Sequence, residues 1–80
     1  MSLYFMNLRD HAEVILDPEG IEMSADAIPG TALAAARDCM AGDLRRGRLD
    51  LRYSIDVHDA QGVVVHSLSF ADALEIVPAN

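Results

Sequence analysis

Hydrophobic residues gather in four short segments of the chain, and each predicts a β-strand, at residues 3–9, 13–16, 52–58 and 63–70. Successive side chains of a strand point to opposite faces, so the first segment has two largely apolar faces. One carries Leu3, Phe5 and Asn7, and the other carries Tyr4, Met6 and Leu8. We therefore expect this strand to lie inside a sheet, or to have its second face covered by a partner.

The last two segments predict a hairpin with one buried face. In the first strand, Tyr53, Ile55 and Val57 alternate with Ser54, Asp56 and His58. In the second strand, one face carries Val64, His66, Leu68 and Phe70, and the other carries Val63, Val65, Ser67 and Ser69. The intervening DAQG (59–62) fits a type I turn followed by Gly62 in the left-handed conformation, which is a G1 bulge.

Residues 29–47 predict an alanine-rich α-helix. Pro29 either kinks a helix that begins at Ser24, a residue type that caps helix N-termini, or starts a new helix. Gly47 is expected to end it. The face expected to pack on the sheet carries Leu33, Met40 and Leu44, flanked by Ala32 and Ala36, with Gly42 on the exposed side.

The order strand, short strand, helix, strand, strand predicts an α+β fold. We expect a two-layer sandwich in which a small antiparallel sheet packs on one helix, with residues 1–80 forming a single domain. Residues 21–23 (IEM) continue an extended path before the helix. The helix then returns the chain so that the N-terminal strand lies beside the C-terminal hairpin.

The formal net charge is −7, from thirteen acidic residues and six Arg. This balance argues against nucleic acid and anionic membranes as partners, because both require clustered positive charge. Five of the six Arg lie in residues 37–52 with only three Asp, which predicts a mildly basic end on an acidic molecule. Such an end could face a partner, or it could simply complement the C-terminal dipole of the helix.

Two Asp-x-x-Gly segments, DPEG (17–20) and DAQG (59–62), are either ligand loops or turns. The acidic residues near them are Asp17, Glu19, Glu22, Asp26, Asp56 and Asp59, and neither segment has the twelve-residue EF-hand spacing. No metal-binding spacing relates the other candidate ligands, which are His11, His58, His66 and Cys39. We therefore interpret both segments as turns and expect no metal ligands.

The sequence also lacks a pattern for catalysis, so we expect no catalytic residues, no cofactor and no enzyme activity. Cys39 is expected to be a buried, inert helical residue. Ser67 and Ser69 flank His66 in a strand, where neighbours point to opposite faces and cannot meet. The segment IPGT, ending at Thr31, is not a phosphate-binding loop.

Cysteine content and hydropathy bear on location. With one cysteine the chain forms no intramolecular disulfide, which suits a reducing compartment. No apolar run approaches the length of a membrane span, and the N-terminal residues lack the layout of a signal peptide. We expect a cytoplasmic protein without membrane contact.

One helix cannot cover both apolar faces of the strands, and Val63 and Val65 add to the uncovered surface. Exposed apolar patches usually mark association sites. The leading hypothesis is therefore a non-enzymatic interaction domain that self-associates as a homodimer or binds a protein partner. An alternative is a regulatory domain that binds a cation or small ligand through the acidic turns. A third is an antitoxin-like partner protein, by analogy of strand–helix layout alone.

Four segments resemble a known family: YFMNLRD (4–10), DPEGIEM (17–23), the Ala-rich helix and VHDAQGVVVHSLSFADA (57–73). They resemble small domains of unknown function of alphaproteobacterial type, which typically open with a Tyr-Phe-Phe-His-Ile-Arg-Asp-like strand. The chain departs from this pattern at Met6 and Asn7, at Pro29–Gly30, and at His66, where the family favours an aliphatic residue. Asn7 weakens any histidine-based role at its position. The resemblance implies a fold and no established activity.

Overall fold

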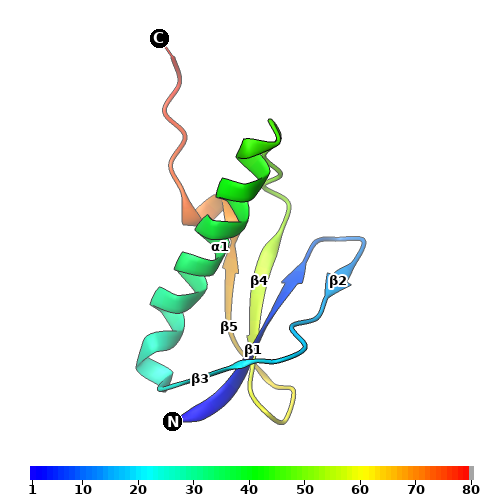
Figure 1. Cartoon of the computed structure of the whole chain (residues 1–80), viewed down its shortest axis with the longest axis vertical. Coiled ribbons are helices and arrows are strands. Elements are labelled where there is room, and N and C mark those ends of the chain that lie inside the picture. Colours follow the sequence, from blue (N-terminus) through cyan, green and yellow to red (C-terminus); the bar gives the residue numbers. More distant parts are fainter. Residues whose placement is uncertain (80) are drawn as a thin grey trace.

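The computed structural model describes residues 1–79, which form an antiparallel sheet with one α-helix on one face (Figure 1). The elements are β1 (Ser2–Arg9), β2 (Val14–Ile15), β3 (Ile21–Met23), the 3-10 helix η1 (Ala25–Ala27), α1 (Ile28–Arg45), β4 (Ser54–His58), β5 (Val64–Ser69) and the 3-10 helix η2 (Phe70–Ala73). The strand order is β2-β1-β4-β5, and β3 also pairs with β1. The predicted α+β class, with its small antiparallel sheet packed on one helix, is therefore confirmed.

Strand β1 lies inside the sheet, as its two apolar faces predict. It pairs with β4 from Phe5↔His58 to Arg9↔Ser54, so the N-terminal strand does lie beside the C-terminal hairpin. It also pairs with β2 at Leu8 and Arg9, and with β3 at residues 2–4. The register shifts by two residues between these last two pairings, so β2 and β3 are the two halves of one interrupted strand.

The core lies between α1 and the helix-facing side of the sheet. Four helical residues spaced four apart are buried, namely Ile28, Ala32, Ala36 and Met40, and they pack with Ile55, Val57 and Phe70. Alanine side chains let the helix approach the strands closely.

The expectation that Leu44 lies on the packing face is wrong, because its exposed fraction is 57%. A step of four residues turns the helix by about 40° beyond a full circle, so the buried stripe rotates away from the sheet toward the end of α1. The last turn of the helix also extends beyond the end of β5 (Figure 1). No helix within residues 1–79 is long and apolar enough to cross a membrane.

The start of α1 settles the role of Pro29. Helix η1 comes first, with Ser24 as its N-cap residue but without a side-chain capping hydrogen bond. Helix α1 then begins at Ile28 with Pro29 in its first turn, so Pro29 belongs to a fresh helix start and does not kink a longer helix. At the other end the helix stops at Arg45, two residues before the predicted Gly47, which has a φ of +83°.

The DAQG segment closes the β4–β5 hairpin as predicted. Gly62 has a φ of +83°, its N–H donates to the Asp59 carbonyl at 3.0 Å, and the Asp59 N–H donates to the Val63 carbonyl at 2.9 Å. The Asp59 carboxylate accepts from the N–H groups of Gln61 and Val63, both at 2.9 Å. Every one of these bonds is local to the turn.

A second irregularity in this hairpin changes the faces of β5. Val57 pairs with His66 while His58 pairs with Val64, so Val65 is an extra residue in β5. Directly opposed residues share a face. Val64 therefore lies with His58 on the side away from the helix, and the prediction that it shares a face with His66 is wrong.

The DPEG segment is a turn, but it also completes the edge of β1. The Asp17 carboxylate accepts from the N–H groups of Glu19 and Gly20, both at 3.1 Å, and from the Met6 N–H at 3.2 Å. The Asp17 N–H in turn donates to the Asn7 side-chain oxygen at 2.9 Å. Asp17 thus takes the place of a strand partner at the gap between β2 and β3.

Gly20 permits this close approach. Its φ is +76°, and a Cβ atom there would lie 2.9 Å from the Tyr4 carbonyl oxygen and 3.0 Å from side-chain atoms of Leu3 and Phe5. At Gly62, by contrast, an added Cβ would meet nothing within 4 Å. The two Asp-x-x-Gly segments therefore look alike in sequence but differ in their surroundings.

We expect Gly20→Ala to destabilise the fold much more than Gly62→Ala. Both changes place a side chain at positive φ, which costs about 1–2 kcal/mol. Gly20→Ala also forces a Cβ against a backbone oxygen, and such overpacking adds roughly 1–3 kcal/mol. Urea unfolding of the two variants measures the difference.

Asp59→Asn is the control for the hairpin turn, since the amide oxygen can still accept hydrogen bonds, and its effect should be mild. Equal losses of unfolding free energy in the two Ala variants would contradict the role given to Gly20.

Candidate functional site

A cleft of about 680 Å³ lies beside the C-terminal half of α1. Helical residues form one wall and the loop before β4 forms the other, over an apolar floor of Leu8, Tyr53 and Phe70. The charged residues at its rim are Asp38, Asp43, Arg46, Arg48 and Asp50. Gly42 also lines the cleft and is half-buried, whereas the sequence predicted an exposed glycine.

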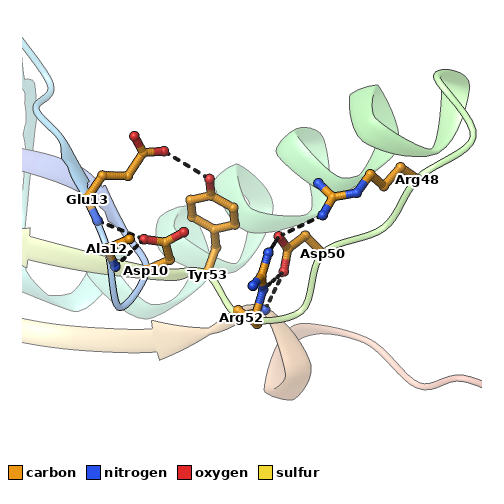
Figure 2. A network of polar contacts seen from close by, with 7 residues as sticks. All are labelled: Asp10, Ala12, Glu13, Arg48, Asp50, Arg52 and Tyr53. Atoms are coloured by element: carbon orange, nitrogen blue, oxygen red, sulfur yellow. Dashed lines mark hydrogen bonds and ion pairs between the residues drawn. The ribbon is translucent and has the colours of Figure 1, made fainter.

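The loop wall is organised around Asp50, which is only 8% exposed (Figure 2). Its carboxylate accepts from the Arg52 backbone N–H at 3.0 Å and from the Arg52 guanidinium at 2.9 and 2.8 Å. Arg48 lies 3.6 Å away on the cleft side. The side-chain and backbone hydrogen bonds from Arg52 hold the pKa of Asp50 far below its usual range.

Tyr53 links this loop to the turn between β1 and β2 (Figure 2). Its hydroxyl donates to Glu13 at 3.1 Å, which raises the pKa of Tyr53. Asp10 accepts from the N–H groups of Ala12 and Glu13 at 2.7 and 2.8 Å. The pKa of Arg52 is raised mainly by its hydrogen bond to Asp50 and by the charge of Asp50, and the charge of Asp10 adds a smaller contribution. The structure thus brings two carboxylates to the Arg-rich end, so the predicted basic end is largely neutralised.

Cys39 lies on the helix wall of the cleft and is exposed, so the expectation of a buried cysteine is wrong. Partial burial of the sulfur, and then the nearby charges of Asp43 and Asp38, raise the pKa of its thiol. A reactive cysteine needs the opposite, because the thiolate is the nucleophile. The cleft therefore does not activate its only thiol.

The charges of the cleft are mostly paired with one another. Arg46 donates to Asp43 at 2.7 Å, and Asp50 is held by Arg52 and approached by Arg48. Because these charges form ion pairs within the chain, little net electrostatic attraction is left for a charged ligand. The apolar part of the cleft lining is formed by Leu8, Tyr53 and Phe70.

The outer face of the sheet, away from α1, holds a polar cluster around the buried Asp56 that the sequence did not predict. Arg9 donates to both Asp56 oxygens, at 2.6 and 3.2 Å, and the Ser67 hydroxyl donates to the same carboxylate at 2.8 Å. Asn7 and Asp56 are 8% and 9% exposed. The first strand's second face is therefore partly polar, and the chain's own segment 16–20 covers part of it.

The two turn aspartates, Asp17 and Asp59, accept hydrogen bonds from the backbone. Burial, the largest influence, acts to raise the pKa of Asp17, but the N–H groups of Gly20, Glu19 and Met6 together leave the pKa lowered. Glu19, Glu22 and Asp26 lie exposed on separate elements. Within residues 1–79, no three or more His, Cys, Asp or Glu side chains are arranged to hold a metal ion.

The remaining candidates are also dispersed. His11 is exposed, His66 is half-buried opposite Val57, and His58 Nδ1 lies 3.1 Å from the Gly62 carbonyl oxygen. The Ser69 hydroxyl accepts from the Asp72 N–H at 3.2 Å as the cap of η2. Thr31 lies half-buried in the first turns of α1.

The second candidate site is the edge of the sheet at β5. β5 is the last strand in the sheet order, and three consecutive valines at its start, Val63, Val64 and Val65, are 57%, 49% and 45% exposed. The Phe70 N–H donates to Tyr53, so alternation directs the N–H groups of Ser67 and Ser69 away from β4. This edge presents backbone groups and apolar side chains together.

We expect Asp56→Asn to lower the unfolding free energy by about 1–2 kcal/mol near neutral pH, because Arg9 and Ser67 lose a charged acceptor. The hydrogen bond from Arg9 is the largest influence on the pKa of Asp56 in the folded state, and it lowers this pKa. Burial acts in the opposite direction, and the hydrogen bond from Ser67 adds to the lowering. Its stabilising contribution is therefore complete above the ordinary Asp pKa of about 3.9 and is lost as pH falls through the lower folded value.

Urea unfolding at neutral and strongly acidic pH tests this. The difference between the wild type and Asp56→Asn should shrink in acid. A difference that stays constant with pH would show that the charge of Asp56 contributes nothing.

Comparison with known proteins gives one match. The family described as "Domain of unknown function (DUF6894)" matches residues 3–71, which include β1 from Leu3 onward, the other strands and α1. No curated protein and no solved structure matches the chain. Because the match spans most of the 80 residues, the chain belongs to this family of domains of unknown function.

Proposed function

We propose that this domain acts by protein association, and that a partner adds a β-strand to the open edge at β5. The observation that carries the proposal is the character of that edge. Strand β5 is six residues long and contains no Asp, Glu, Lys, Arg or Pro. Its first two residues, Val64 and Val65, and the preceding Val63 are exposed. Natural sheets normally protect such edges with charge, proline or a covering segment. An unprotected edge offers hydrogen bonds and apolar contacts to a strand of another chain.

The opposite edge of the same sheet supports the proposal by contrast. It is divided into β2 and β3, of two and three residues, and the gap between them is filled by the Asp17 carboxylate. Four carboxylates, Glu13, Asp17, Glu19 and Glu22, lie in or beside these strands. Short, interrupted and charged edges resist strand addition, so the two edges of this sheet differ sharply.

A cation- or small-ligand-binding function receives less support. Asp17 and Asp59, the acidic residues of the two turns, already accept hydrogen bonds from their own turns. The cleft beside α1 pairs most of its charges internally. An antitoxin-like role rests on the analogy of strand–helix layout alone, and no contact among residues 1–79 adds to it.

Affinity capture from the native host tests the proposed function with matched baits. Val65→Lys places a charge on the β5 edge, whereas Leu44→Lys places the same charge at a similarly exposed site at the end of α1. We expect the wild type and Leu44→Lys to retain the same partners and Val65→Lys to lose them. Identical captured sets from all three baits would contradict association through β5.

A further inference from the structure

We infer that the strand added to β5 is β5 of a second copy of this chain, paired antiparallel about a two-fold axis. This inference rests on the proposed function and names its partner. Cyclic dimers are the commonest assemblies, and a two-fold axis lets one edge bind its own copy. The result is one continuous sheet through two molecules, with both α1 helices on the same side.

Charge favours a second copy at this position. The chain carries a net charge of −7, so most surfaces of two identical molecules repel when they meet. Residues 60–71 contain no Asp, Glu, Lys or Arg, and β5 lies wholly within this stretch. A basic partner would be drawn to the carboxylates elsewhere. Two acidic copies can approach along β5, because neither this strand nor the residues that flank it carry a formal charge, whereas the short β2 lies between Glu13 and Asp17.

The backbone of β5 suits the same pairing. The bulge at Val65 disturbs only the start of the strand, and His66 to Ser69 pair regularly with β4. The outward N–H groups of Ser67 and Ser69 would therefore meet outward carbonyl groups of the other β5. In this arrangement the exposed valines of each copy would lie beside the β5 strand of the other copy.

A competing added strand exists within the chain, and the test must separate it. The segment after η2 begins at Leu74 in extended conformation, and its Ile76 and Val77 are 62% and 76% exposed. It runs away from the sheet (Figure 1). Pro78 limits it to four residues, against six in β5, so we place β5 at the interface.

Sedimentation equilibrium of the purified chain, from low to high micromolar concentration, tests the inference. We expect a concentration-dependent dimer for the wild type, for Leu44→Lys and for a chain ending at Glu75. Val65→Lys should remain monomeric at all concentrations, with an unchanged circular dichroism spectrum. Val63→Lys, at the more exposed end of the hairpin, serves as a second variant if Val65→Lys does not fold.

Three results would overturn the inference: a wild-type monomer at high micromolar concentration, a dimer that survives both lysine variants, or a dimer lost on removal of residues 76–80. The first of these leaves the proposed function standing if capture of other proteins still depends on Val65. The proposed function fails under a different result. It fails if Val65→Lys captures every protein that the wild type captures, including untagged copies of this chain.

Discussion

The hydrogen bond from the Met6 backbone N–H to the Asp17 carboxylate is the contact on which the sheet depends. Strand β1 is central, with β4 on one side and the two halves β2 and β3 on the other. The pairing of β1 shifts register by two residues between β2 and β3, so the residues between these two strands must bulge out of the edge. Asp17 holds this bulge by accepting from Met6 and from its own turn, while Gly20 passes against the Tyr4 carbonyl at positive φ. A single loop thus closes the edge and covers part of the outer face.

This closure makes the sheet asymmetric. One edge is short, interrupted and acidic, and the other is a continuous uncharged strand. The partly buried Arg9–Asp56–Ser67 cluster keeps the middle of the outer face polar, so the exposed apolar residues of the sheet concentrate at its margins. This asymmetry is the basis of the proposal that a second copy of this acidic domain pairs at β5 and not at the opposite edge.

The features that the sequence predicted correctly are governed by local rules. Gly62 in DAQG and the alternation of β4 follow from turn chemistry and strand periodicity. The geometry of proline left two alternatives at Pro29, a kink or a helix start, and the structure has the helix start. The features it missed join residues far apart in the chain. Nothing local to Asp17 reveals that it caps Met6, and nothing local to Asp56 reveals Arg9, although a polar residue in the middle of a strand signals a nearby partner.

The wrong predictions also have structural causes. An ideal helix places Leu44 on the packing face and Cys39 beside it, but the last turn of α1 extends beyond β5, and Cys39 lies about 100° around the helix from the buried Met40. Unbroken alternation places Val64 with His66, and the extra residue Val65 reverses this. Sequence proximity makes the Arg-rich segment basic, whereas Asp10 and Glu13 reach it through space.

Amide hydrogen exchange, resolved by residue and measured at low and high protein concentration, tests the central claim that one edge is closed and the other is open to a second copy. The Met6 amide should be protected at both concentrations, because its acceptor belongs to the same chain. The Ser67 and Ser69 amides should exchange rapidly in dilute solution and become protected in concentrated solution. Rapid exchange of Met6, or rapid exchange of Ser67 and Ser69 at every concentration, would contradict the account.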